Sequence, residues 1–432
     1  MRDFLPEDVR RRQYVIGIIA DVYQKYGFEP LETPSVENIE TLQGKYGEEG
    51  DRLIFKILKR GEGAETGQAD LALRYDLTVP LARVVAEYRG KLPKFFKRYQ
   101  VQPVWRADRP QKGRFREFYQ CDVDAIGSTS MTVEVELLSA AADVLTRLGF
   151  ADFQIVINHR KLLNAVLNHA GIPADLHGPA LVAMDKLDKI GLDGVKKEFE
   201  ERGIGASVAD KLSGVLESAS ESTLAQLGEI LDDEGKTAVR ELGEIFALSK
   251  HTSAGAHLKL DAYLARGLSY YTGPIFEIRV ADLAGSLGGG GRYDNLIGMF
   301  LGEQIPASGI SLGLERILVV MGERQMFPAS VVSTPADVMV AQWFANRTDL
   351  YLQFANELRR AGLRVELYPE SPTDDGKKVG EKQFKYAAAR GVPFVAVIGA
   401  DELANGTVTV KNMKTGEQKT LPRTETVTWL SN

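Results

Sequence analysis

Cysteine is almost absent from this sequence: Cys121 is the only one among 432 residues. A single thiol excludes an internal disulfide and any zinc site built from several thiolates, and it fits a reducing compartment. The chain also lacks an apolar run of about 18 residues, the length needed to span a membrane, and its first residues, MRDFLPEDVRRR, contain no apolar signal core. These absences favour a cytoplasmic protein that does not enter the membrane.

The charge of the chain has no strong excess of either sign. Lys and Arg number 53 against 59 Asp and Glu, which gives a formal net charge of −6. Nothing global therefore indicates a nucleic-acid partner, and a polyanion would have to be met by local patches. The contents of 44 % hydrophobic and 26 % charged residues are those of a soluble globular protein, and the length allows two or three domains.

Residues 97–124 are the segment around which the sequence is organised. Two runs with polar–apolar alternation of period two flank a charged turn, which predicts an antiparallel hairpin with one apolar and one polar face. The polar face carries Gln120, Asp122 and Asp124 over about 13 Å, roughly the span of an amino acid joined to a phosphate. Cations such as Arg114 in the turn, beside paired carboxylates, suit a ligand with anionic and cationic ends. The alternative is a solvated hairpin with alternating charge.

This hairpin resembles motif 2 of the class II aminoacyl-tRNA synthetases, in the form found in the histidyl family. The match lies in VWR at 104–106, RPQKGR at 109–114 and REFYQCD at 116–122. A second match, RGLSYY at 266–271, resembles the histidyl signature RGLDYY. It departs from that signature at Ser269, where aspartate is usual, which leaves the local support of this loop open.

Two earlier segments also match the family. A helix predicted over 7–26 and a short strand over 28–34 resemble motif 1, which forms the dimer interface in that family. Residues 70–83, DLALRYDLTVPLAR, predict a strand followed by a helix from about Pro80, a residue favoured in a first turn. From the residues alone Asp76 is best interpreted as a helix cap. The resemblance instead assigns Asp76 and Thr78 to the substrate ammonium group.

Two later segments complete the predicted site. The run SLGGGGR at 286–292 lacks the lysine of a phosphate-binding loop, and its glycines would let the backbone lie flat against a planar base. Residues 307–321 predict a strand, a glycine and a helix, and resemble motif 3. The alternative for Arg316 on that helix is a salt bridge at the helix N-terminus.

The predicted fold is α/β with an α+β core: the antiparallel sheet of a class II synthetase with flanking helices, a helical insertion and a C-terminal α/β domain. The catalytic core would occupy 1–172 and 254–325. Between them, 173–253 predicts a helical insertion, which in this family contacts the tRNA acceptor arm, although a plain surface module is the alternative. After a linker at 326–336, the βαβαβ pattern of 337–432 resembles the anticodon-binding domain of the histidyl, prolyl, threonyl and glycyl enzymes.

The resemblance implies a homodimeric ligase that activates L-histidine with ATP and transfers it to tRNA(His). Mg²⁺ would arrive with ATP, without a tightly bound cofactor or protein-held metal. This chemistry needs charge compensation and alignment, and Arg106 and Arg266 are the implied catalytic pair. The residues assigned to ATP are Arg106, Arg114, Phe118, Gly289, Gly290 and Arg316. Those assigned to histidine are Asp76, Thr78, Gln120, Asp124, Arg266, Tyr270 and Tyr271.

Three alternatives stay open at this point. One is a catalytically dead, histidine-binding paralogue that acts as a sensor, such as the regulatory subunit of ATP phosphoribosyltransferase. Another is a synthetase for a different amino acid, against which RGLSYY argues. The third is a non-enzymatic RNA-binding module. The first is disfavoured because the resemblance continues through Arg266 and into the C-terminal domain. An ATP–pyrophosphate exchange assay over twenty amino acids separates the second and third from the histidyl enzyme, whereas the tRNA contacts cannot be read from the sequence.

Overall fold

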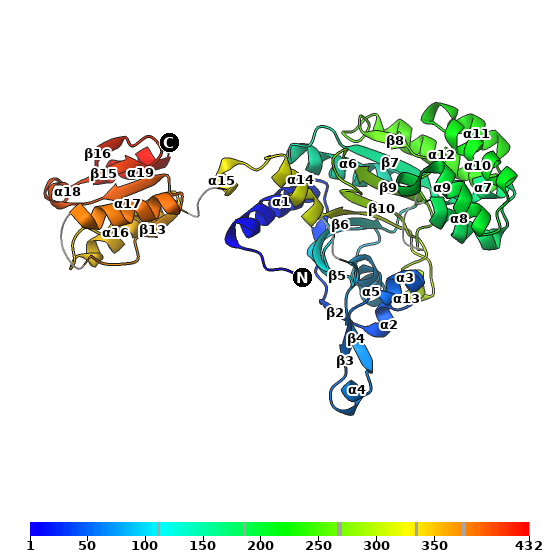
Figure 1. Ribbon diagram of the computed structural model, residues 1–432, viewed down its shortest axis with the longest axis horizontal. Coiled ribbons are helices and arrows are strands. Elements are labelled where there is room, and N and C mark those ends of the chain that lie inside the picture. The colour runs from blue at the N-terminus through cyan, green and yellow to red at the C-terminus, as the bar shows by residue number, and fades with distance from the viewer. Residues whose placement is uncertain (110–112, 185–186, 266–269, 333–335, 373–376, 432) are drawn as a thin grey trace. The chain divides into compact units, whose positions relative to one another are not determined.

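The chain consists of two compact units, Met1–Met326 and Phe327–Asn432, each of which has its own sheet. They are described from a computed structural model, shown in Figure 1. The residues described are 1–109, 113–184, 187–265, 270–332, 336–372 and 377–431. Among them, no helix is both long enough and apolar enough to cross a membrane.

The first unit is built on an eight-stranded sheet in the order β1-β5-β6-β11-β10-β9-β7-β8. All neighbours are antiparallel except the pairs β1/β5 and β7/β8, so the predicted antiparallel sheet is confirmed. Its strands are β1 (Glu29–Pro30), β5 (Phe96–Trp105), β6 (Glu117–Ile126), β7 (Gln154–His159), β8 (Leu258–Leu260), β9 (Pro274–Arg279), β10 (Gly288–Arg292) and β11 (Ala307–Gly313).

Strands β5 and β6 form the predicted hairpin, with Gln102 opposite Gln120 and Arg98 opposite Asp124. The solvated-hairpin alternative is wrong, because β6 also pairs with β11 and both faces of β6 are covered. Asp122, on the polar face, is only 2 % exposed. A polar face that is buried this deeply must satisfy its charges internally or with a ligand.

Three helices cover the apolar face of these strands: α1 (Pro6–Lys25), α6 (Thr132–Arg147) and α14 (Leu314–Glu323) pack against β5, β6 and β11. Helix α5 (Thr78–Tyr88) begins two residues before the proline that was expected to open it. The strand predicted over 28–34 is reduced to β1, because Pro30 and Pro34 have no N–H to continue a ladder.

Two smaller assemblies extend from the main sheet. An arm, at the bottom of Figure 1, is the sheet β2-β4-β3. Its elements, with the short helices near it, are β2 (Val36–Asn38), α2 (Ile39–Leu42), α3 (Gly47–Arg52), β3 (Lys56–Leu58), α4 (Glu62–Glu65), β4 (Ala69–Leu73) and α13 (Gly298–Leu301). The helical bundle, green in Figure 1, comprises α7 (Arg160–Ala170), η1 (Ala174–Leu176), α8 (His177–Met184), α9 (Leu187–Glu201), α10 (Ala206–Ser218), η2 (Glu221–Thr223), α11 (Leu224–Ile230) and α12 (Asp233–Ser249).

The second unit is a five-stranded sheet in the order β13-β12-β14-β15-β16, with β12, β13 and β14 parallel and the last two strands antiparallel. The predicted βαβαβ pattern is therefore confirmed in β12, α16, β13, α17 and β14, and the antiparallel pair β15 and β16 follows it. Its elements are α15 (Ala329–Val332), β12 (Val338–Val340), α16 (Thr348–Arg360), β13 (Val365–Leu367), α17 (Lys377–Ala389), β14 (Phe394–Val397), α18 (Ala400–Asn405), β15 (Thr407–Asn412), β16 (Gln418–Pro422), η3 (Arg423–Glu425) and α19 (Thr426–Ser431).

Candidate active site

Two pockets lie side by side on the polar face of the main sheet. They share Arg106, Gln120, Ser286, Gly289 and Ser311, so they form one continuous cleft with two ends. We name them by their charged residues. The acidic pocket is lined by Asp76, Asp122, Asp124 and Glu277, and the basic pocket by Arg106, Arg114 and Arg316 together with Asp108 and Glu315.

Asp76 caps helix α5, as predicted from the residues alone, and it also lines the acidic pocket. Its Oδ1 accepts the backbone N–H of Val79 at 3.1 Å, which caps helix α5, and the hydroxyl of Tyr46 at 3.0 Å. Its Oδ2 lies 3.4 Å from the hydroxyl of Tyr270, on the wall of the acidic pocket. Burial raises the pKa of Asp76, and its hydrogen bonds and Arg106 oppose the increase. A cationic group entering the pocket would relieve the cost of this buried carboxylate.

Asp124 is held by two neighbours. The hydroxyl of Tyr293 donates a short hydrogen bond to its Oδ1, and Nη2 of Arg98 lies 2.9 Å from its Oδ2. Arg98 is fully buried, and its Nε and Nη1 have no hydrogen-bond partner among the described residues. Burial raises the pKa of Asp124, while Arg98 and Tyr293 act against this. Arg98 and Tyr293 therefore fix the Asp124 carboxylate in the wall of the acidic pocket.

Gln120 stands where the two pockets meet. Its Nε2 donates to Oγ of Ser311 at 3.0 Å, whereas its buried Oε1 has no partner among the described residues. An unsatisfied buried carbonyl oxygen costs about 1–3 kcal/mol, so its presence indicates a site where a ligand donor is expected.

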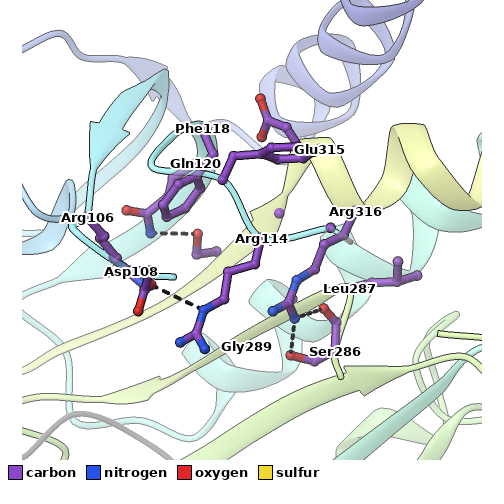
Figure 2. A pocket seen from close by; sticks show the side chains of 15 residues that line it. Arg106, Asp108, Arg114, Phe118, Gln120, Ser286, Leu287, Gly289, Glu315 and Arg316 are labelled. Atoms are coloured by element: carbon purple, nitrogen blue, oxygen red, sulfur yellow. Dashed lines mark hydrogen bonds and ion pairs between the residues drawn. The ribbon is translucent and has the colours of Figure 1, made fainter. Parts of the chain in front are cut away.

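Two arginines of the basic pocket, Arg106 and Arg114, come from the connection between β5 and β6, and the third, Arg316, comes from α14 (Figure 2). Arg106 follows β5, donates from Nε to the carbonyl of Tyr75 at 3.1 Å, and lies over the rings of Tyr75 at 4.3 Å and Phe118 at 5.1 Å. Arg114 pairs with Asp108 at 3.2 Å, and Arg316 on α14 donates to the carbonyl of Ser286 at 2.5 Å. Three guanidinium groups in a pocket that also contains the aromatic ring of Phe118 suit a nucleoside triphosphate.

The glycine run forms strand β10 in the middle of the sheet, between β9 and β11. A Cβ at Gly290 would lie 2.0 Å from the carbonyl oxygen of Gly309, and one at Gly309 would lie 1.9 Å from Oδ1 of Asp124. Side chains are therefore excluded here by the close approach of the strands and of a carboxylate. Gly289 and Gly290 give the cleft a flat wall of backbone.

Glu315 is a buried acid that supports β6 from helix α14. Its Oε2 accepts the backbone N–H of Tyr119 at 2.9 Å, and its Oε1 has no partner among the described residues. Burial raises the pKa of Glu315 to about 7, against the smaller effects of its backbone hydrogen bonds and of Arg12 and Arg2.

This pKa predicts a pH-dependent contribution to stability. A raised folded-state pKa favours the folded state below pH 4.5, and that contribution is lost as the pH rises to about 7. In the wild type, ionisation of Glu315 should lower the free energy of unfolding by up to about 3 kcal/mol over this pH range. Glu315→Gln should not show this decrease when unfolding is measured by chemical denaturation. The exposed control Glu40→Gln should leave the profile unchanged. A Glu315→Gln profile parallel to the wild type would contradict a buried, neutral Glu315.

Every site residue predicted from the sequence lines one of the two pockets, except Arg266. Arg266 and Ser269 lie outside the described residues. Sequence reasoning assigned no role to Ser286, Ser311 or Glu315 in the cleft walls. Of these only Glu315 gave a signal, as the acid beside Arg316 at the start of a helix.

An antiparallel sheet that carries such a cleft between motifs 2 and 3 defines the catalytic domain of a class II aminoacyl-tRNA synthetase. A family model described as histidyl-tRNA synthetase matches residues 1–317, and one described as anticodon binding domain matches 337–432. The chain therefore belongs to the histidyl-tRNA synthetase family.

Individual relatives agree with this assignment. A histidine–tRNA ligase of Flavobacterium johnsoniae is 44 % identical, covering 96 % of this chain and 95 % of that protein. One from Porphyromonas gingivalis is also 44 % identical, covering 98 % and 96 %. The crystal structure of histidyl-tRNA synthetase from Nostoc sp. PCC 7120 has a TM-score of 0.84 at 30 % identity, covering 100 % of this chain and 97 % of that one. An apo S. aureus histidyl-tRNA synthetase, at 22 % identity and a TM-score of 0.69 over 100 % and 98 %, shares the fold.

Proposed function

We propose that this chain is a histidine–tRNA ligase. The histidine carboxylate attacks the α-phosphorus of ATP, the bond to the β-phosphate breaks, and pyrophosphate leaves. A ribose hydroxyl at the 3′ end of tRNA(His) then attacks the carbonyl carbon of the adenylate, and AMP leaves. The observation that carries this proposal is the cleft itself: an acidic pocket and a basic pocket meet at Arg106, where the two substrates would join.

We assign roles to the residues of the cleft from the family resemblance, and their places in the two pockets support these roles. In the acidic pocket, Asp76, Thr78 and Gln120 bind the ammonium group of histidine, and Asp124 with Tyr271 contacts its imidazole ring beside Tyr270. In the basic pocket, Phe118 and the β10 backbone at Gly289 and Gly290 enclose adenine, and Arg114 and Arg316 hold the β- and γ-phosphates. Arg106 meets the carboxylate and the α-phosphate, with Arg266 as its partner by family resemblance.

The remaining parts of the proposal concern partners. Mg²⁺ accompanies ATP as part of the substrate, and it balances phosphate charge that the arginines do not meet. Helix α1 and strand β1 match the dimerisation motif of the class, so we assign a homodimer. We also assign it to the cytoplasm, a reducing compartment that fits the single cysteine. The helical bundle and the second unit supply separate surfaces for the acceptor arm and anticodon of tRNA(His).

The direct test is ATP–pyrophosphate exchange with each of the twenty amino acids. Histidine should support exchange, and the other nineteen should stay near background, because a site that hydrogen-bonds a polar side chain rejects analogues lacking it by about 10⁴ or more. Exchange with another amino acid would assign a different synthetase. Histidine binding without exchange would instead favour the regulatory paralogue.

A further inference from the structure

Asp122 is a third carboxylate in the acidic pocket, between Gln120 and Asp124 on the polar face of β6. It is 2 % exposed and lines the pocket wall. Its Oδ1 lies 3.5 Å from Nε2 of Gln120, at the limit of a hydrogen bond, and it accepts a hydrogen bond from Ser311 on the neighbouring strand. The described residues thus leave Asp122 with weaker fixation than Asp124.

The charges around Asp122 do not balance without a ligand. Asp124 is ion-paired with Arg98, and the proposed site for the ammonium group is Asp76. Glu277, which also lines the pocket, is paired with Arg279 at 2.7 Å. Among the described residues, no cation forms an ion pair with Asp122. Arg98 also acts on Asp122 through its charge, but its Nη2 is paired with Asp124, so a proton or a positive group from the ligand would stabilise the buried Asp122 carboxylate.

We propose that Asp122 is a specificity-determining residue for the imidazole ring, and that its carboxyl group and the ring share one proton. This rests on the proposed function, in which histidine occupies the acidic pocket. In one form, an imidazolium N–H donates to the carboxylate. In the other, the carboxylic acid donates to a neutral ring nitrogen. The ion pair and the neutral pair have the same total charge. The pocket therefore holds one proton between Asp122 and the ring in either form, with no change of geometry.

The acidity of Asp122 supports this arrangement. Burial raises the pKa of Asp122 to about 7, Asp124 and Asp76 add to the increase, and Arg98 and the Ser311 hydrogen bond oppose it. An unperturbed imidazole has a pKa of about 6.5, so acid and ring are closely matched. The hydroxyls of Tyr271 and Tyr293 complete the polar surroundings of this end of the pocket.

A shared proton would distinguish histidine from an analogue whose ring has the same shape but lower basicity. Asp122→Asn keeps the size and polarity of the side chain but cannot exchange a proton with the ligand. We expect its kcat/KM for histidine in pyrophosphate exchange to fall about 10- to 100-fold, as for a lost hydrogen bond to a charged group. The KM for ATP should stay unchanged. The ratio of kcat/KM for histidine to kcat/KM for 1,2,4-triazole-3-alanine should decrease, because the variant can no longer share a proton with a basic ring.

Asp143→Asn is the matched control, since it makes the same change on α6, where Asp143 accepts the Tyr26 hydroxyl outside both pockets. Its selectivity should equal that of the wild type. Removing the buried charge at Asp122 should not lower the melting temperature. If Asp122→Asn leaves the ratio of kcat/KM for histidine to kcat/KM for the triazole analogue unchanged, the inference is overturned, while the proposed ligase function still stands. Absence of exchange in the wild type would instead overturn the proposed function.

Discussion

Replacing Arg106 with alanine is expected to lower the rate of adenylate formation by about 10²–10³-fold, the usual cost of removing one donor that meets developing charge. Arg106 lines both pockets, so it stands where the carboxylate would reach the α-phosphate. Its Nε bond to the carbonyl of Tyr75 and its stacking between Tyr75 and Phe118 hold the guanidinium before any ligand enters. Preorganisation of this kind avoids rearrangement at the moment of reaction.

Pyrophosphate exchange at saturating histidine and ATP measures this effect. Arg106→Lys should fall between wild type and alanine, because lysine keeps the charge but loses the planar fork. The exposed Arg60→Ala, in the arm, should exchange at the wild-type rate and serves as the control. If Arg106→Ala stays within about threefold of wild type, Arg106 only packs against Tyr75, and the carboxylate must be met elsewhere.

Gly309→Ala should lower kcat/KM for histidine by about 10²-fold or more, with a smaller change in KM for ATP. The added Cβ would lie 1.9 Å from Oδ1 of Asp124, so the carboxylate must move away from Tyr293 and Arg98. A displacement of about 1 Å in a positioned group typically costs about 10²-fold in rate. The effect should appear mainly in kcat/KM for histidine and much less in KM for ATP, because Asp124 lines only the acidic pocket.

Gly322→Ala provides the control for this prediction. Gly322 lies in helix α14, and a Cβ there would have no neighbour within 4 Å. Alanine is the better helix former by about 1 kcal/mol, so this variant should be as active as the wild type and equally or more stable. A Gly309→Ala enzyme with normal histidine kinetics would show that Asp124 has room to move without loss of the pocket.

Local patterns predicted the centre of the molecule well. The alternation in residues 97–124 predicted β5, β6 and the face on which Gln120, Asp122 and Asp124 gather, because a strand assigns faces residue by residue. The apolar stripe of 7–26 likewise predicted helix α1 within one residue at either end.

Other features depend on pairing between distant segments, which local patterns do not contain. The ion pair of Arg98 with Asp124 follows from the register of β5 on β6. The bond from Tyr119 to Glu315 follows from the packing of α14 against β6. Arg266 lies outside the described residues, and only its resemblance to the histidyl signature assigns it a role.

Strand β10 also restricts how this pocket can change in evolution. Its glycines present main chain to the ligand, so point mutation offers no side chains there to enlarge, shorten or recharge. A methyl group added at Gly290 would clash with the backbone of β11. Such a substitution would disrupt the site and could not simply change which amino acid it prefers. New amino-acid preference is therefore expected at positions whose side chains line the acidic pocket, and a mutant library for altered substrates should vary positions such as 120, 122 and 124 while leaving 288–291 untouched.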